Sequence, residues 1–295
     1  MSISLRHFLL MNIMKAHNLA CPIDGKKLEQ MDKQFVCESG HSFDIARQGY
    51  INLLPVQHKR SKQPGDNKAM VLARTHFLNA GIYEPVANKL SEIVSTYIIN
   101  DNDYCLLDAG CGEGYYFDFL LQRLRQQPGE NDLSFIGLDI SKDAIVQATK
   151  RNKRTSWVVG TNRQPPLAAG SVDIILCMFG FFCEQGFYKV LKPGGKIIVV
   201  DPGMDHLKQL REIIYPEIKK SKLSDASQLD EQKFSLLSSD ALQFEVHISG
   251  KQQINHLLLM TPHFYRASKA GRQAAAELDK LDLSIDVVFK TLQKI

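Results

Sequence analysis

Apolar and polar positions follow two different periods along the chain from about residue 85 onward. Short apolar runs alternate there with longer stretches in which an apolar side chain recurs every three or four positions. The first pattern is typical of buried strands, and the second is typical of helices with one buried face. Their alternation predicts a parallel sheet covered by helices, which is an α/β fold.

The expected elements can be placed by residue number. Strands are predicted at 104–107, 134–138, 157–159, 172–176 and 196–200, with weaker ones at 244–248 and 283–289 that would close the sheet edge. Helices are predicted at 69–78, 115–125 and 142–150. The Pro-Gly-Gly run at 193–195 is expected to end a further helix and to turn the chain back into the sheet.

The N-terminal part of the chain is organised differently. The runs CPIDG and CESGH, which begin at Cys21 and Cys37, are spaced like the two knuckles of a small metal ribbon. We therefore expect an N-terminal extension at 1–20, a ribbon-like domain at 21–54, and a basic linker with a helix at 55–84. The larger α/β domain is expected to occupy 85–295.

The composition is that of a globular protein. The 295 residues are 44% apolar and 23% charged, and no apolar run approaches the ~18 to 20 residues of a membrane-spanning helix. These values exclude a disordered or membrane-spanning chain, and the absence of a secretory pattern near the N-terminus predicts a cytoplasmic protein. The net charge of +4 is unevenly spread, because residues 1–75 hold eleven Lys and Arg against six Asp and Glu.

The six cysteines are too few for a disulfide scaffold in a chain of this length. Cys21 and Cys37 belong to the ribbon runs. The other four lie in or beside apolar segments and are expected to be reduced and buried: Cys105, Cys111, Cys177 and Cys183.

A glycine-rich loop follows the first predicted strand of the α/β domain. It runs D-A-G-C-G-E-G from Asp108, with glycines at the alternate positions Gly110, Gly112 and Gly114. Glycines let the backbone turn sharply and approach a ligand, and the N-terminus of the following helix attracts a carboxylate or phosphate. The G-x-G-x-x-G spacing of a dinucleotide site is absent, since Tyr115 stands three residues after Gly112. Taken alone, such a loop is equally compatible with a turn that binds nothing.

The D-x-G-x-G-x-G form resembles the first motif of the Rossmann-like methyltransferases that use S-adenosylmethionine, in which the loop faces the methionine part of the cofactor. Asp139 stands at the end of the second predicted strand, where a carboxylate can bind two adjacent ribose hydroxyls. The KPGGK turn at 192–196 also lies at the expected distance. Together these features favour a cofactor loop over an empty turn.

Several longer segments carry a closer resemblance. They are GYINLLPVQHKR from Gly49, PGD from Pro64, AGIY from Ala80, the loop from Asp108 to Tyr116, and LMTP from Leu259. They are similar to the 23S ribosomal RNA guanine-N1 methyltransferases, and the similarity runs from Cys21 nearly to the end of the chain. The resemblance implies a zinc-ribbon RNA-recognition domain joined to a class I methyltransferase domain that methylates N1 of one guanine in a 23S rRNA hairpin. The cofactor contacts that it implies fall on Tyr83, Gly112, Glu113 and His206.

The resemblance also implies a metal site with the pattern C-x-x-C followed by C-x-x-x-H. The second position is an aspartate in this chain, so the ligand set becomes Cys21, Asp24, Cys37 and His41. A carboxylate oxygen binds zinc at about 2.0 to 2.2 Å, so a structural four-ligand site is expected, weakened because oxygen replaces a softer thiolate. The alternative is a ribbon held by hydrophobic contacts, with both thiols unligated.

Two basic clusters agree with an RNA partner. Lys59, Arg60 and Lys62 form one cluster, and the run KRNKR at 150–154 forms a second. We expect both to contact phosphates, although each alone is more typical of a solvated surface. The target base is expected against the aromatic run CMFGFFC at 177–183, which departs from the Y-A-P-type sequence expected of the family.

The sequence does not identify a catalytic residue. Methyl transfer to guanine N1 requires alignment of the two atoms and loss of the N1 proton. Asp201 is a candidate base by position only, and a structural turn carboxylate explains it equally well.

Two other functions are compatible with part of the pattern. A methyltransferase of a small molecule would use the same cofactor, but it needs neither a ribbon nor a basic N-terminal quarter. A non-catalytic RNA-binding protein on the same fold would bind RNA without the cofactor. The sequence also leaves open whether the protein is a monomer or a homodimer.

Overall fold

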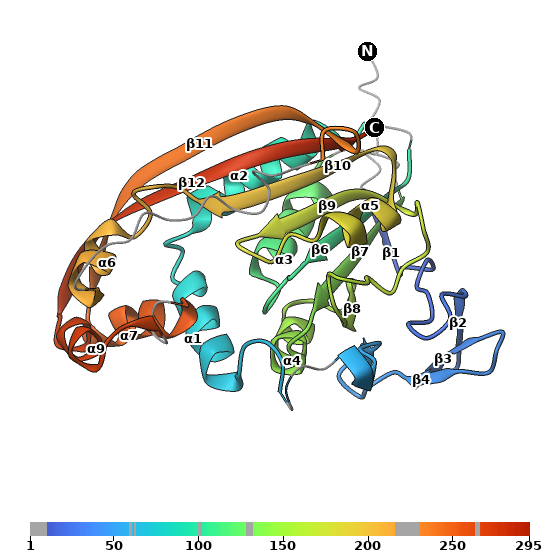
Figure 1. Cartoon of the computed structure of the whole chain (residues 1–295), viewed down its shortest axis with the longest axis horizontal. Helices are drawn as coiled ribbons and strands as arrows, with labels where there is room; N and C mark the ends of the chain where they lie inside the picture. Colours follow the sequence, from blue (N-terminus) through green and yellow to red (C-terminus); the bar gives the residue numbers. More distant parts are fainter. Residues whose placement is uncertain are drawn as a thin grey trace, which may run out of the picture.

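A twisted sheet, with nine strands among the described residues, runs through the protein, and a three-stranded ribbon lies at one end of it (Figure 1). The computed structural model describes residues 11–58, 61, 63–99, 102–127, 132–215, 230–262 and 266–295. The main sheet has the order β11-β12-β10-β9-β6-β7-β8-β5, and β1 pairs with the start of β7. Its strands are β1 (Asn12–Met14), β5 (Tyr50–Asn52), β6 (Tyr104–Ala109), β7 (Asp132–Asp139), β8 (Ser156–Val159), β9 (Val172–Met178), β10 (Leu191–Pro202), β11 (Phe234–Ser249) and β12 (Lys280–Lys294).

Most pairs in this sheet are parallel, and the antiparallel pairs both involve β12. The strand order reverses direction beside β6, because β7 and β8 lie on one side of it and β9 and β10 on the other. In open α/β sheets ligands bind at the carboxyl ends of the strands near such a reversal. The topology therefore points to the end of β6 as the place for a site.

The two faces of the sheet are covered by different parts of the chain. Leu106 and Leu107 are consecutive in β6, both are fully buried, and they belong to separate hydrophobic cores, as the alternation of side chains along a strand requires. Among the described residues, seven helices contribute side chains to the first core. The second receives α5 together with residues of the N-terminal segment and the base of the ribbon. The ribbon thus helps to cover a face of the sheet.

The helices begin where the sequence provides caps. Asn67 accepts a hydrogen bond at the start of α1, Ser141 does so at α4, and Ser268 at α9. The helices are α1 (Lys68–Asn79), α2 (Glu84–Ser95), α3 (Tyr115–Arg125), α4 (Lys142–Arg151), α5 (Glu184–Val190), α6 (Lys208–Ile214), α7 (Lys251–Met260) and α9 (Lys269–Ala276), with a 3-10 turn at Val56–His58.

The ribbon is an antiparallel sheet of β2 (Leu28–Met31), β3 (Gln34–Cys37) and β4 (Ser42–Asp44). Strand β5 follows it directly in the chain but pairs with β8, so it belongs to the main sheet. Strand β1 precedes the ribbon and also joins the main sheet. Both ends of the ribbon are therefore anchored in the larger sheet.

The predicted α/β fold is confirmed, and the elements predicted between 104 and 200 are present. The two weaker strands are longer than predicted, at 16 and 15 residues, and form an antiparallel pair whose register shifts once, between Leu236 and Ser238. Strand β1 lies in the extension 1–20, for which the sequence pattern predicts no element. All six cysteines are free; Cys183 is only half-buried, which corrects its prediction as a buried residue, while the other five are buried.

Candidate functional site: a cofactor cavity and a metal-ligand cluster

A cavity of about 790 Å³ lies at the carboxyl ends of the central strands, beside the strand-order reversal. Its size is within the range of small-molecule sites, about 300 to 1,000 Å³. Seven of the eight residues predicted to contact the cofactor lie in its wall: Tyr83, Asp108, Gly110, Gly112, Glu113, Asp139 and His206.

Asp108 is buried in this wall, and one of its two carboxyl oxygens has no polar partner among the described residues. Its side chain is 1% exposed, and its Oδ1 atom has no hydrogen bond to any described residue. Burial, together with repulsion from Asp139, raises the pKa of Asp108 to about 8. A buried carboxyl group with an unfilled acceptor suits a ligand that brings a cation or a donor, as the ammonium group of S-adenosylmethionine does. The residues present therefore fit this cofactor.

The glycines of the loop have two different uses. Gly110 and Gly112 line the cavity with φ angles of 95° and 55°, a backbone region that side-chain-bearing residues rarely adopt. Gly114 is not part of the cavity wall; a Cβ atom there would lie 2.7 Å from the ring of Trp157. Gly114 therefore allows α3 to start directly against that ring, and the structure gives it a packing role.

Asp139 fastens the loop to the end of β7. Its Oδ2 accepts a hydrogen bond from the backbone N–H of Gly112 at 2.9 Å, and its Oδ1 accepts one from Ser141 at 2.7 Å. Each carboxylate oxygen has a second lone pair, so each can still accept a hydrogen bond from a ribose hydroxyl. Asp139 can thus hold the loop and a ribose at the same time.

Glu113 is 1% exposed and lies between the cavity and α4. Its Oε2 accepts a hydrogen bond from Nε of Arg151 at 2.7 Å and one from Thr75 at 3.4 Å. Burial raises the pKa of Glu113, and the charge of Arg151 opposes that shift. Its Oε1 atom has no partner among the described residues, which makes it a second buried acceptor in the cavity wall.

An aromatic group forms another part of the wall. The hydroxyl of Tyr83 lies 3.2 Å from Nε2 of His206, and the ring of Phe179 stacks on His206 with centroids 6.0 Å apart. The backbone N–H of Asp286 donates to Nδ1 of His206 at 3.3 Å, which places the proton on Nε2, facing Tyr83. These contacts fix the positions of two residues that the family resemblance marks as cofactor contacts.

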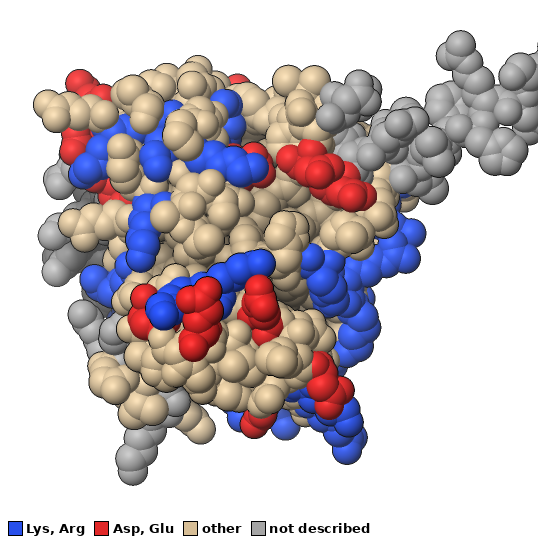
Figure 2. Space-filling model, turned by 90° about the vertical axis from the view of Figure 1, so that its right-hand side faces the viewer, with Lys and Arg blue, Asp and Glu red and all other residues tan. Residues whose placement is uncertain are grey.

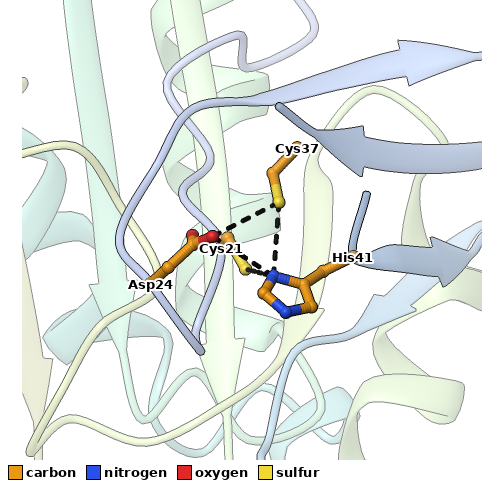
Figure 3. A group of neighbouring side chains, drawn as sticks. All are labelled: Cys21, Asp24, Cys37 and His41. Atoms are coloured by element: carbon orange, nitrogen blue, oxygen red, sulfur yellow. Dashed lines mark hydrogen bonds and ion pairs between the residues drawn. The ribbon is translucent and has the colours of Figure 1, made fainter. Parts of the chain in front are cut away.

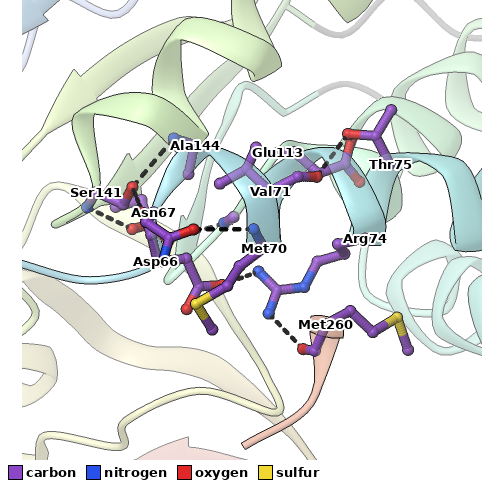
Figure 4. A network of polar contacts seen from close by, with 12 residues as sticks. Asp66, Asn67, Met70, Val71, Arg74, Thr75, Glu113, Ser141, Ala144 and Met260 are labelled. Atoms are coloured by element: carbon purple, nitrogen blue, oxygen red, sulfur yellow. Dashed lines mark hydrogen bonds and ion pairs between the residues drawn. The ribbon is translucent and has the colours of Figure 1, made fainter. Parts of the chain in front are cut away.

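A polar network that was not predicted from the sequence lies along the cavity wall, and Figure 4 shows its contacts. Arg74 of α1 pairs with Asp66, and its second nitrogen donates to the carbonyl of Met260 at 2.9 Å. The carbonyl of Asp66 accepts from the hydroxyl of Ser141 at 2.6 Å. The network joins α1, the loop before it, the end of α7 and the start of α4. The PGD and LMTP segments of the family resemblance meet here. Their presence in the sequence was the one sign that could have pointed to this network.

The four predicted metal ligands come together in the ribbon, and Figure 3 shows their side chains pointing toward one another. Cys21 and Asp24 come from the loop before β2, Cys37 from the end of β3, and His41 from the residue before β4. Nδ1 of His41 lies 3.5 Å from Sγ of Cys21, 3.4 Å from Sγ of Cys37 and 3.2 Å from Oδ2 of Asp24.

These separations can be compared with tetrahedral zinc. Bond lengths of about 2.3 Å to sulfur and about 2.1 Å to nitrogen or oxygen give ligand-to-ligand distances of about 3.4 to 3.6 Å. The distance from Sγ of Cys37 to Oδ2 of Asp24 is 3.6 Å, and the three distances to His41 fall close to the same range. A hydrogen bond from the backbone of Lys26 also lowers the pKa of Asp24, which keeps it ionised as a ligand must be. The donor set therefore fits zinc, with aspartate in the position of a cysteine.

Comparison with protein families matches the two parts of the chain that carry most of these residues. The N-terminal zinc-ribbon family described as "RlmA, N-terminal" matches residues 19–62, and a methyltransferase domain matches residues 106–195. A protein of Bacillus subtilis, named provisionally as a 23S rRNA (guanine-N1)-methyltransferase, is 27% identical over 90% of this chain and 94% of its own length. The 23S rRNA (guanine(748)-N1)-methyltransferase of Streptomyces fradiae is 32% identical over 65% of this chain and 66% of its own length.

A third relative decides the family. It comes from Micromonospora griseorubida, carries the provisional name 23S rRNA (guanine-N1)-methyltransferase, and is 32% identical over 65% of this chain and 68% of its own length. The chain belongs to the 23S rRNA (guanine-N1)-methyltransferase family. The predicted family, enzyme class, cofactor and zinc-ribbon domain are thereby confirmed.

Other predicted residues of this methyltransferase lie outside the cavity. Asp201 is not part of its wall, although its Oδ2 is buried without a partner among the described residues. In the run 150–154, Arg151 is paired with Glu113, whereas Lys153 and Arg154 are exposed. The cluster of Lys59, Arg60 and Lys62 lies outside the described residues. Within the described ranges, no helix has the length and apolar character needed to cross a membrane.

Proposed function

We propose that this enzyme transfers a methyl group from S-adenosylmethionine to N1 of one guanine in a hairpin of 23S rRNA. The observation that carries the proposal is the charge distribution of the cavity. Buried acids line one part of it, and four arginines also line it: Arg74, Arg163, Arg211 and Arg266. Acids suit a cationic cofactor. Arg74 is paired with Asp66, but the other three arginines form no ion pair with a described residue, and such arginines suit an RNA phosphate or base.

We further propose roles for the residues in the wall. Asp108 receives the ammonium group of the cofactor, Asp139 receives its ribose, and Gly110 and Gly112 let the backbone approach it. Tyr83, Glu113 and His206 complete the contacts. Gly114 takes no direct part in this proposal, because it packs against Trp157. When bound, the cofactor supplies an electrophilic methyl group on a sulfonium, and the chain itself aligns the acceptor atom and excludes water.

Residues 21–54, which hold the ribbon and the main-sheet strand β5, are proposed as the RNA-recognition domain. Residues 85–295 are proposed as the methyltransferase domain, with 55–84 as the segment between them. Zinc bound by Cys21, Asp24, Cys37 and His41 would hold the ribbon's loops in place. The face from which the ribbon projects carries several patches of lysine and arginine with acidic side chains between them (Figure 2). Such a mixed surface offers phosphate contacts at separate points and not along one continuous band.

Labelled S-adenosylmethionine and unmodified 23S rRNA fragments test the proposal. We expect label in one hairpin, and mapping by primer extension should place it on N1 of a single guanine, because methylation there blocks base pairing. Label on a small metabolite with none on RNA would identify a small-molecule methyltransferase instead. RNA binding without cofactor binding in a calorimetric titration would identify a non-catalytic protein.

We propose the cytoplasm as the compartment, because the RNA substrate of the proposed reaction is ribosomal. A homodimer is the candidate assembly. Light scattering at micromolar concentration decides between a monomer of 33.3 kDa and twice that mass.

A further inference from the structure

Two exposed phenylalanines line the cavity together with the proposed cofactor residues. Phe179 and Phe181 are 37% and 47% exposed, and no other phenylalanine of the described ranges is exposed. An aromatic ring in contact with water is stabilised when a flat apolar surface covers it, and unpaired RNA bases commonly stack on such rings. The two rings mark the part of the cavity that suits a nucleic-acid base.

The backbone holds Phe179 in an unusual conformation. Its φ angle of 51° lies in the left-handed region, which is strained for a residue with a side chain. Its N–H donates to the carbonyl of Val200 at 2.8 Å, and its ring contacts Tyr83 and His206. Strain of this kind persists where the surroundings impose it, and it concentrates at functional sites. The ring is thus fixed in the cavity wall.

Phe181 is fixed by a different contact. The side-chain amide of Asn162 donates to the carbonyl of Phe181 at 3.0 Å and also to the carbonyl of Ala109 at 3.1 Å. Ala109 is the last residue of β6, directly after Asp108. Asn162 therefore ties the loop that carries Phe181 to the strand that carries the proposed cofactor acid.

Arg163 lies over the ring of Phe181, with its guanidinium carbon 4.9 Å from the ring centroid. Arginine on an aromatic face is held by a cation–π interaction that leaves its N–H groups free to donate at the edge. Arg163 is exposed and lines the cavity, and within the described part of the chain no carboxylate forms an ion pair with it. Its donors are therefore available to a substrate.

We propose that Arg163 recognises the target guanine through O6 and N7 and stabilises the negative charge that O6 gains as N1 loses its proton. Phe181 holds the guanidinium, and Phe179 provides the ring beside which the base packs. Arginine donating two hydrogen bonds to O6 and N7 is the most common specific contact to guanine, and adenine opposes it with an amino donor at the position of O6. The inference rests on the proposed function, because it assigns the base-binding residues of the same reaction.

The proposed reaction needs no carboxylate base in the cavity. N1 attacks the methyl carbon, the carbon–sulfur bond breaks, and S-adenosylhomocysteine leaves while the N1 proton passes to solvent water. Loss of that proton spreads negative charge over N1 and O6. A fixed cation beside O6 favours the deprotonated base, so the reaction needs electrostatic stabilisation more than a strong general base.

The test uses the full-length protein and two RNA hairpins that differ only at the target nucleotide, which is guanine or 7-deazaguanine. 7-Deazaguanine lacks the N7 acceptor but keeps N1 and O6. Single-turnover methylation by the wild type should be about tenfold slower on the 7-deaza hairpin, the discrimination expected for one hydrogen bond of a bidentate pair. The Arg163→Gln enzyme should be about 100-fold slower on guanine than the wild type and show no further loss on 7-deazaguanine.

The pH profile supplies a second readout. The rate rises with pH as N1 deprotonates, and Arg163→Gln should move the midpoint of that rise upward by about one pH unit, because a nearby positive charge no longer favours the deprotonated base. Arg123→Gln is the matched control: it removes an exposed arginine that also lies over a phenylalanine ring, that of Phe119, but does not line the cavity, and it should keep both the 7-deaza effect and the wild-type midpoint.

Equal rates of the wild type on the two hairpins, or an unshifted midpoint in Arg163→Gln, would overturn the role of Arg163 while leaving the methylation of RNA in place. If the wild type methylates neither hairpin nor any other 23S fragment, the proposed function itself is refuted, and the role of Arg163 is refuted with it.

Discussion

Asp108 illustrates how burial changes the chemistry of a common side chain. Its pKa of about 8 lies well above the ordinary value of 3.8, so the carboxyl group stays neutral in the free protein until the pH is slightly alkaline. An acid whose pKa is raised by folding contributes full stability below its unfolded pKa and loses that contribution as the pH rises through the folded value. Here the loss runs from about pH 4 to about pH 8.

Asp108→Asn should therefore stabilise the cofactor-free protein at alkaline pH. We expect little difference in the free energy of unfolding at pH 5 and a gain of about 1 to 3 kcal/mol at pH 8.5, since asparagine never carries the buried charge. Urea unfolding at the two pH values measures it. Asp279→Asn, at an exposed position, should show no such pH-dependent gain.

The same Asp108→Asn enzyme should bind S-adenosylmethionine at least tenfold more weakly, and unchanged affinity would contradict the proposed ammonium contact.

Asp24 is the residue at which the metal site departs from its family pattern. Asp24→Cys should raise the affinity for zinc by about one order of magnitude, because thiolate is a softer ligand than carboxylate. Competition with a coloured chelator measures the change. Asp44→Cys adds a thiol to the exposed strand β4, outside the ligand cluster, and should leave the affinity unchanged. A weaker site in Asp24→Cys would show that the ribbon's geometry is adapted to the carboxylate.

Among the elements, those with short-range signals were predictable. The glycine loop, its strand and its helix are adjacent in sequence. Apolar periodicity predicted the strand and the helix, and the glycine spacing with its resemblance to methyltransferases singled out Asp108 and Asp139. Strand β11 was hard to predict at its full length because its side chains are mostly half-exposed or exposed, so it carries little apolar signal. Asn162 and Arg163 could not be found from sequence, since their partners lie on other strands and loops that only the fold brings near.

The packing of β7 against Trp157 gives a prediction at the scale of elements. A Cβ atom on Gly137 would lie 2.3 Å from the ring of Trp157, which belongs to the neighbouring strand β8. Gly137→Ala should lower the free energy of unfolding by about 2 to 3 kcal/mol, since a close-packed sheet cannot move aside without strain. Urea unfolding at neutral pH tests this.

Gly170→Ala is the comparison for Gly137→Ala. Gly170 has a φ angle of 58° but no atom within 4 Å of an added Cβ, so its cost should be confined to backbone strain of about 1 kcal/mol. Similar losses in the two variants would mean that the ring of Trp157 can shift.

The whole molecule shows where the positive charge resides. The basic excess of residues 1–75 does not come from the ribbon, because 21–54 holds four Lys and Arg against five Asp and Glu. The excess comes from the segments before and after it. The ribbon is therefore expected to recognise RNA by shape and by specific contacts, while its flanking segments and the methyltransferase domain supply most of the attraction to phosphates.

Removal of zinc should separate the two sites of the molecule. Because β1 and β5 are held in the main sheet independently of the metal ligands, chelation should loosen 21–44 without opening the cofactor cavity. We expect faster hydrogen exchange in β2 to β4, a loss of RNA affinity of about tenfold or more, and an unchanged Kd for S-adenosylmethionine. A parallel loss of cofactor affinity would show that the ribbon supports the cavity through the face of the sheet that it covers.

The pairing of β1 with β7 and of β5 with β8 has a practical consequence for building hybrid enzymes. A chimera that exchanges residues 1–54 as one block would also replace two strands of the recipient's central sheet, and foreign strands must then match its register. Junctions placed after Met14 and before Tyr50 would keep both native strands and exchange only the inserted ribbon. Target preference could then be moved between relatives by exchanging this internal segment, while the methyltransferase domain keeps its own strands β1 and β5.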